Sequence, residues 1–196
     1  MKKVYRCCLL AVLGMLLATA ATAQSVDAFF GFNTLITGTG PNGVPKMGGG
    51  FFPNAGGDLI FLPHNLGIGM QVAWRGSQQN FLGVGARPIL YTFNLVWEPS
   101  STQSSLRPDF AIGFGSQNLR FYQGTFTCTT FGGCVNYVSS KHLLLHAGVG
   151  LKYYLSEHIF LRPAVDYYNI RHNVEYGVPA AWQVGVSIGY TLGPSQ

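Results

Sequence analysis

Large apolar residues alternate with small or polar residues near the end of the chain. One face of the segment 181–192 carries Trp182, Val184, Val186, Ile188, Tyr190 and Leu192, and the positions between them hold glycine and uncharged polar residues. A period of two predicts a β-strand whose two faces differ chemically. Because the second face carries no charge, the pattern is not that of a half-buried strand in a soluble protein.

Seven further segments have the same strand character and are separated by stretches rich in turn residues. Together the eight predicted strands cover residues 26–35, 47–62, 66–75, 82–97, 106–121, 138–155, 158–172 and 180–192. The connections after residues 62 and 155 are short and most of the others are longer, with 98–105 as an exception. Alternating short and long connections are typical of a transmembrane β-barrel.

The fold class that these strands predict is an all-β, eight-stranded, antiparallel, up-and-down transmembrane β-barrel. Its large apolar face would contact lipid and its small polar face would line the interior, so no charged exterior is required. A closed ring also pairs every backbone group, as the hydrocarbon region demands. After the first residues, no segment reaches the eighteen apolar residues of a helical span.

The first residues have a different pattern. A basic start, an apolar run and Ala-Thr-Ala ending at Ala23 predict a secretory signal peptide over residues 1–23, cleaved between Ala23 and Gln24. The apolar run is shorter than the ~20 residues of a membrane-spanning helix, which disfavours a retained anchor. We therefore expect export through the general secretory route and a barrel domain at residues 24–196.

The charge of the remaining chain is low and nearly balanced. Without Lys2, Lys3 and Arg6, nine Lys and Arg residues stand against seven Asp and Glu residues. This balance gives no reason to expect a nucleic-acid partner. So few charges are also insufficient to cover the surface of a soluble domain.

Several charged and polar residues fall on the predicted inward face. We expect them to form a mixed-sign network that fills the lumen, because buried charges persist when they are paired and hydrogen-bonded. The alternative is that those near strand ends, above all Arg75 and Asp58, lie in water. The set comprises Asp58, Arg75, Asp109, His146, Lys152, Arg162 and Asp166.

Aromatic residues fall near the predicted strand ends, as in the two interfacial girdles of membrane barrels. Trp74 and Trp182 lie at the ends next to long loops, and Trp97, Tyr153 and Tyr190 lie at the ends next to short turns. The stretch from Cys128 to Cys134 predicts a small disulfide-closed loop in an exported chain.

Three motif matches do not predict catalysis or ligand binding in this context. The GVSIG match around Ser187 lies inside a strand, with no helix and no histidine after it. GTGPNG at residues 38–43 has no helix to open, and HLLLH at residues 142–146 would hold its two histidines roughly 13 Å apart on a strand. We therefore expect no catalytic residue, no metal site and no cofactor.

The chain resembles the small eight-stranded outer-membrane β-barrel proteins of the OmpA/OmpX type, from Gln24 to Leu192. The resemblance is carried by the strand pairs GGGFF to GMQVAW and HAGVG to VDYY, and by the last strand. In that strand Gln183, Gly185, Ile188 and Tyr190 match the family's assembly signal, although Leu192 and GPSQ replace the usual terminal aromatic residue.

This resemblance implies an outer-membrane location in a Gram-negative-type bacterium. It also implies contact with outer-membrane lipids, insertion by the barrel-assembly machinery, and an envelope-structural or adhesion and recognition role through surface loops that contact an extracellular ligand. A narrow porin for small solutes is the alternative. A lipid-modifying enzyme is disfavoured because no histidine precedes a serine by two positions, as in lipid A deacylases of this size.

Overall fold

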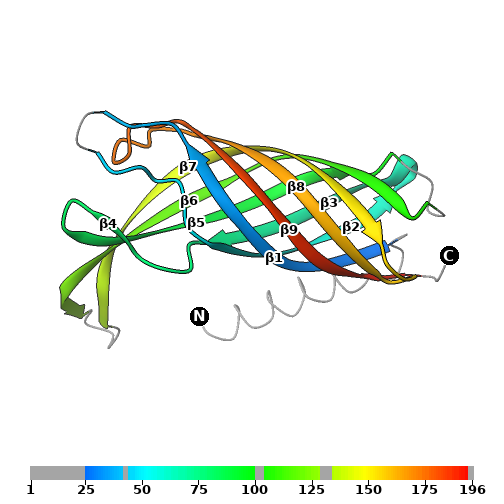
Figure 1. Cartoon of the computed structure of the whole chain (residues 1–196), viewed down its shortest axis with the longest axis horizontal. Helices are drawn as coiled ribbons and strands as arrows, with labels where there is room; N and C mark the ends of the chain where they lie inside the picture. Colours follow the sequence, from blue (N-terminus) through cyan, green and yellow to red (C-terminus); the bar gives the residue numbers. More distant parts are fainter. Residues whose placement is uncertain (1–24, 42–43, 100–103, 129–133, 194–196) are drawn as a thin grey trace, which may run out of the picture.

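The structure is a computed structural model that describes residues 25–41, 44–99, 104–128 and 134–193. The predicted signal peptide and its cleavage site at Ala23 and Gln24 lie outside these residues. The described chain is almost entirely β-structure (Figure 1), with strands β1 (Ser25–Thr37), β2 (Phe52–Leu62), β3 (Leu66–Trp74), β4 (Gln79–Phe81), β5 (Val84–Trp97), β6 (Leu106–Cys128), β7 (Cys134–Tyr154), β8 (Ile159–Ile170) and β9 (Ala180–Leu192). A 3-10 turn, η1 (Pro63–Asn65), joins β2 to β3. Among the described residues, no helix has the length and hydropathy needed to cross a bilayer.

Eight of these strands form a closed antiparallel barrel. The long strands pair in chain order, β1 also pairs with β9, and β3 pairs with β5. The short β4 pairs with β5 at one end of the ring. The predicted eight-stranded up-and-down barrel is therefore confirmed, and its closure leaves the ring without an open edge.

The two ends of the barrel differ. The turn end holds η1, the turn between β7 and β8, and the facing ends of β5 and β6; the described chain also begins and ends there. The loop end holds the connections from β1 to β2, β3 to β5, β6 to β7 and β8 to β9 (left in Figure 1). These names, turn end and loop end, are used below.

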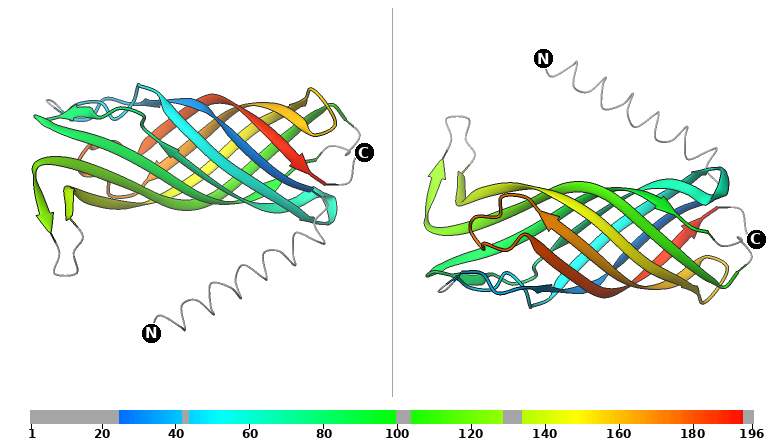
Figure 2. Two further views of the ribbon diagram at one scale, coloured as in Figure 1. Left: turned by 90° about the horizontal axis from the view of Figure 1, so that it is seen from below. Right: turned by 90° about the horizontal axis from the view of Figure 1, so that it is seen from above.

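The strands are strongly tilted, as both views in Figure 2 show. The tilt can be measured by following directly paired residues from strand to strand around the ring. Starting at Trp97 on β5, the successive partners are Phe110, Val149, Val165, Val184 and Thr34. The series continues through the hydrogen bond from Gly76 N to Phe51 O and returns to β5 at Arg87, ten residues from Trp97. Over eight strands this offset is about one residue per strand. Residues at the same height along the barrel axis therefore lie about one residue nearer the turn end on each successive strand from β5 to β8 than direct pairing would place them.

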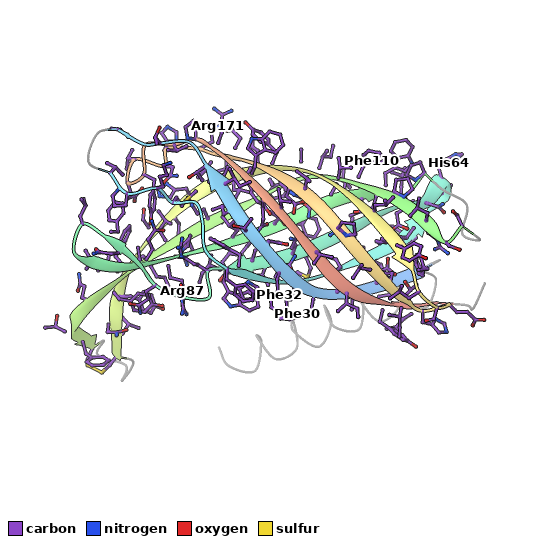
Figure 3. All side chains as sticks on the ribbon, in the orientation of Figure 1. Phe30, Phe32, His64, Arg87, Phe110 and Arg171 are labelled. Carbon is purple, nitrogen blue, oxygen red and sulfur yellow. A yellow bond between two sulfur atoms is a disulfide. The ribbon has the colours of Figure 1, made fainter. Side chains whose placement is uncertain are left out.

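The faces of the strands are divided as the alternation predicts. In β9 the large apolar and aromatic side chains point outward and are 40–58% exposed, whereas Gln183, Ser187 and Thr191 point inward and are 0–8% exposed. Phe30, Phe32 and Phe110 project from the outer surface in the same way (Figure 3). The apolar face is thus outside and the polar face inside.

Inward glycines leave room for polar side chains from the neighbouring strand. A Cβ on Gly185 would overlap the side-chain oxygen of Asn33, and a Cβ on Gly150 would overlap a carboxylate oxygen of Asp109. The glycine-rich face is therefore a packing requirement of a narrow lumen.

The strand ends differ from the predicted ranges at the loop end. β2 begins at Phe52, so that residues 47–51 belong to the preceding loop. β6 continues seven residues beyond the predicted end at Phe121, and β7 begins at Cys134, four residues before Val138. This extended β6–β7 hairpin bends away from the barrel axis beyond the loop end (Figures 1 and 2).

Candidate functional site

A buried ammonium group lies among three carboxylates near the turn end of the lumen. Lys152 of β7 is fully buried, and its Nζ contacts Asp27 Oδ2, Asp58 Oδ2 and Glu98 Oε1, with 3.3 Å to Asp58. These acids come from β1, β2 and the residue after β5, so Lys152 links strands across the lumen. Pairing of this kind compensates for the large cost of burying each charge.

The three carboxylates also define where a hard cation could bind. Their oxygens lie within 4.8 Å of one another, and oxygen ligands of this kind suit calcium or magnesium. The Lys152 ammonium already contacts all three carboxylates. The protein's own side chain therefore supplies the cation in this arrangement.

A second ion pair lies deeper in the barrel. The Arg162 guanidinium donates from Nε to both oxygens of Asp109, at 3.2 and 3.0 Å, and from Nη2 to Oδ2. Its Cζ is 4.9 Å from the centre of the Phe29 ring. Both charged groups are buried, and the two-pronged contact fixes their relative orientation.

The middle of the lumen is held by hydrogen bonds around His146. Its Nδ1 lies 2.7 Å from Asn94 Oδ1, and its Nε2 lies 3.0 Å from Asp166 Oδ1. The ring stacks on Tyr168 with centroids 5.1 Å apart, and the Tyr168 hydroxyl donates to Gln183 Oε1 at 2.6 Å. Polar groups from four strands, β5, β7, β8 and β9, are thereby connected.

Two members of this luminal set were not predicted from the sequence. Asp27 is inward on β1, but bulky residues at both Phe29 and Phe30 obscure the alternation there. Glu98 directly follows β5 and falls in a predicted connection. Asp27 could be identified because the inward positions of β1 recur at every second residue, and Asp27 falls in the same series as Asn33 and Leu35.

Arg75 contacts residues at the loop end and not the carboxylates near the turn end. Arg75 follows the last residue of β3, and its Nη1 donates to Met47 O at 3.3 Å and to Gln79 Oε1 at 2.8 Å. Both partners belong to the loop end. The Arg75 Cζ also lies 5.8 Å from the centre of the buried Phe52 ring, so Arg75 borders the apolar side chains at the loop end.

An apolar cluster occupies the loop end of the lumen, which the sequence did not predict. Strand residues and two loop residues, Met47 and Tyr176, are buried together there. The strand members include Leu35, Phe52, Leu90, Leu119, Leu144 and Ile170. Burial raises the pKa of Tyr176 to about 12, and the nearby Arg75 cation opposes this rise. Loops from two connections therefore cover the loop end of the lumen with apolar side chains.

The predicted interfacial aromatics lie on the outer surface at strand ends. Trp182 is near the loop end of β9, and Trp97, Tyr153 and Tyr190 are near the turn end; all four are 45–50% exposed. Trp74 ends β3 at the loop end and is half-buried.

The two remaining predicted sites also have defined positions. Gln183 and Gly185 are on the inward side of β9, and Ile188 and Tyr190 are on its outward side. A disulfide bond joins Cys128 to Cys134 at the end of the β6–β7 hairpin.

The closed ring, apolar exterior and charged, filled interior define a transmembrane β-barrel protein. The sequence matches the family described as outer membrane protein beta-barrel domain over residues 8–193, and the chain belongs to this family. The family indicates a Gram-negative outer membrane as its location. Comparison with curated protein sequences finds no match.

Several solved structures have the same fold at low sequence identity. The outer membrane protein OprG from Pseudomonas aeruginosa is similar with a TM-score of 0.58 and 16% identity, covering 88% of this chain and 97% of that chain. Neisserial surface protein A is similar with a TM-score of 0.56 and 11% identity, covering 86% of this chain and 95% of that chain. Ail, the attachment invasion locus protein of Yersinia pestis, was solved in complex with the heparin analogue sucrose octasulfate. It is similar with a TM-score of 0.54 and 13% identity, covering 86% of this chain and 98% of that chain.

Substitution of Lys152 by methionine should destabilise the barrel by about 3–5 kcal/mol, because it leaves three buried carboxylates without their cation. Urea unfolding in phosphatidylcholine vesicles, followed by tryptophan fluorescence, measures the change. Lys46→Met at the exposed loop end is the matched control and should change the free energy of unfolding by less than about 0.5 kcal/mol. Equal stability of Lys152→Met and the wild type would show that the ammonium is not needed.

The raised pKa of Tyr176 predicts an alkaline transition at the loop end. The neutral phenol stabilises the folded state fully below the ordinary tyrosine pKa of about 10. This contribution is lost as the pH rises through about 12, where the folded phenol ionises. A tyrosinate absorbance titration should lose one late-ionising group in Tyr176→Phe. An unchanged titration curve in this variant would contradict the assigned burial.

Proposed function

We propose that the protein is an outer-membrane surface protein whose β6–β7 hairpin recognises an extracellular ligand, while the barrel anchors it and remains closed. The observation that carries this proposal is the extension of β6 and β7 beyond the barrel. Paired residues of the hairpin reach from the barrel to Cys128 and Cys134, whereas the pairing of β5 with β6 ends at Gly85 and Tyr122. This anchoring role is compatible with an additional structural role in the envelope.

The hairpin offers a surface suited to recognition. Phe126 is 72% exposed, and Val135 and Val138 are also exposed. Tyr122 and Tyr137 have ring centroids 5.9 Å apart, which gives the hairpin an ordered aromatic pair. The disulfide limits the freedom of the hairpin, and a restrained loop loses less entropy on binding.

The proposal places the loop end outside the cell and the turn end in the periplasm, since membrane barrels of this kind have short periplasmic turns. It includes cleavage between Ala23 and Gln24 after export through the secretory route. It also assigns Gln183, Gly185, Ile188 and Tyr190 to recognition by the barrel-assembly machinery. Trp74, Trp97, Tyr153, Trp182 and Tyr190 would lie at the two lipid interfaces.

A closed lumen is favoured over a narrow porin. The inward side chains of Gln117, Lys152 and Gln183 are fully buried, whereas a water-filled pore would leave such groups accessible. The apolar cluster around Met47 and Tyr176 adds a second obstruction at the loop end.

A binding role is also favoured over catalysis. Ser187, the serine of the GVSIG match, is buried inside the lumen, with its Oγ 3.3 Å from Asn54 Nδ2. It lies in the middle of β9 and lacks the strand-to-helix turn that exposes a nucleophilic serine.

The purified wild-type protein should give no steady conductance in planar bilayers, because charged and apolar side chains fill the lumen along its length. Single-channel recording over a range of voltages measures this directly. A persistent open level above that of protein-free bilayers would refute the closed lumen and support the porin alternative.

Removing the apolar contacts of the hairpin should abolish surface recognition without affecting the barrel. Cells that display the protein are tested for adherence to immobilised heparin and matrix proteins, since Ail was solved with a heparin analogue. The triple variant Phe126→Ser, Val135→Ser, Val138→Ser should lose the adherence above vector-only cells.

The matched control changes exposed apolar residues of other loops, Leu82→Ser and Val174→Ser, and should retain adherence. Heat-dependent gel mobility verifies that both variants are folded. Equal adherence of the triple variant and the wild type, or no adherence above vector-only cells, would count against the hairpin as the recognition element.

A further inference from the structure

The charges of the chain are distributed unevenly between its two ends. Five of the seven acidic side chains lie in the lumen or at its turn end, namely Asp27, Asp58, Glu98, Asp109 and Asp166. Glu157 lies in the turn between β7 and β8, and Glu175 pairs with His142 at 2.9 Å. The basic residues outside the lumen at the loop end therefore have almost no acidic counterpart.

Four of these basic residues form a row on the outer surface, here called the basic row: Arg87, Arg120, Lys141 and Arg171. They come from β5, β6, β7 and the residue after β8, which are neighbouring strands. Arg87 and Arg120 are direct cross-strand partners. Lys141 faces Asn118 on β6, and Arg171 N donates to Leu143 O at 2.8 Å, which continues the pairing of β7 with β8.

The tilt of the strands brings the basic row to nearly one level. Ser139 is directly opposite Arg120, and Lys141 lies two residues nearer the turn end than Ser139. In the same way, Arg171 lies two residues nearer the turn end than the position opposite Lys141. This displacement has the direction that the strand tilt requires for residues at the same height along the barrel axis. Arg171 projects from the outer surface and, with Arg87, lies in the loop-end half (Figure 3).

The basic row borders the lipid-facing belt. Tyr91 on β5, Phe114 on β6 and Leu143 on β7 are exposed on the same outward face and lie closer to the turn end. A cation at this border is at the depth of the lipid headgroups, and its apolar neighbours contact the acyl chains.

No side-chain carboxylate of the described residues forms an ion pair with the basic row, and the described ranges contain every Asp and Glu of the chain. Like charges directly opposite each other in a sheet are destabilising. Arg87 donates from Nη2 to Gly76 O at 2.9 Å, whereas its Nε and the Nε of Arg120 are buried without a hydrogen-bond partner in the described structure. Arg120 is held over the Tyr137 ring, with its Cζ 4.7 Å from the ring centre.

We propose that the basic row binds the phosphate groups of an anionic lipid in the external leaflet of the outer membrane. Guanidinium groups match phosphate geometry, and each cation at a membrane surface adds to the attraction of anionic headgroups. A lipid phosphate between Arg87 and Arg120 relieves the repulsion of the pair. The inference rests on the proposed orientation, in which the loop end faces outward.

Lipid binding is measured on the folded full-length barrel in zwitterionic detergent micelles by native mass spectrometry. Bisphosphorylated lipid A is the probe, and the same lipid without phosphates is the comparison. Arg120→Gln and Lys141→Gln should each weaken binding roughly fivefold, and the double variant roughly 25-fold, if each cation contributes as at an anionic surface. Lys46→Gln, an equal charge change at the same end but outside the row, should leave the affinity unchanged.

Equal binding of the dephosphorylated lipid, or equal loss in Lys46→Gln, would overturn the proposal. If the row variants lost binding of sucrose octasulfate but kept lipid A, the row would instead be a site for a soluble polyanion. The orientation is tested separately by labelling a cysteine at exposed Val174 on intact cells, so its failure is distinguishable from failure of the lipid site.

Discussion

Contact of the outer surface with hydrocarbon is the constraint on which the rest of this structure depends. Lipid tails cannot solvate a charge, so charged residues within the belt must point inward. Inside a narrow ring they must also be paired, and Lys152 and Arg162 meet this need with carboxylates from other strands. Glycine beside Asp109 and Asn33 supplies the space for such contacts. The polar lumen is therefore a consequence of the apolar exterior.

The kind of contact that fills the lumen changes along the barrel axis. Ion pairs dominate near the turn end, hydrogen bonds around His146 hold the middle, and apolar side chains fill the loop end. Each layer is filled by side chains of the protein itself. The proposed ligand contacts therefore lie outside the lumen, on the β6–β7 hairpin and on the basic row.

Periodicity predicted the eight strands and the inward positions of Asp58, Asp109, Lys152, Arg162 and Asp166, because a period of two determines the direction of each side chain. It could not extend past a strand end, which is why Glu98, the residue after β5, was missed. The burial of Met47 and Tyr176 depends on how separate loops fold over the barrel. The long hairpin was underestimated because its outer residues face water on both sides and lack a clear alternation.

The central claim is that the large apolar face contacts lipid, and spin-label accessibility tests it most directly. Labels at Ile112 and Ile188, which are 62% and 55% exposed on the outward face, should be reached by oxygen dissolved in the bilayer and shielded from an aqueous nickel chelate. A label at Val174, 78% exposed in a loop, should show the opposite preference. Access of the nickel chelate to Ile112 and Ile188 equal to that at Val174 would contradict the account.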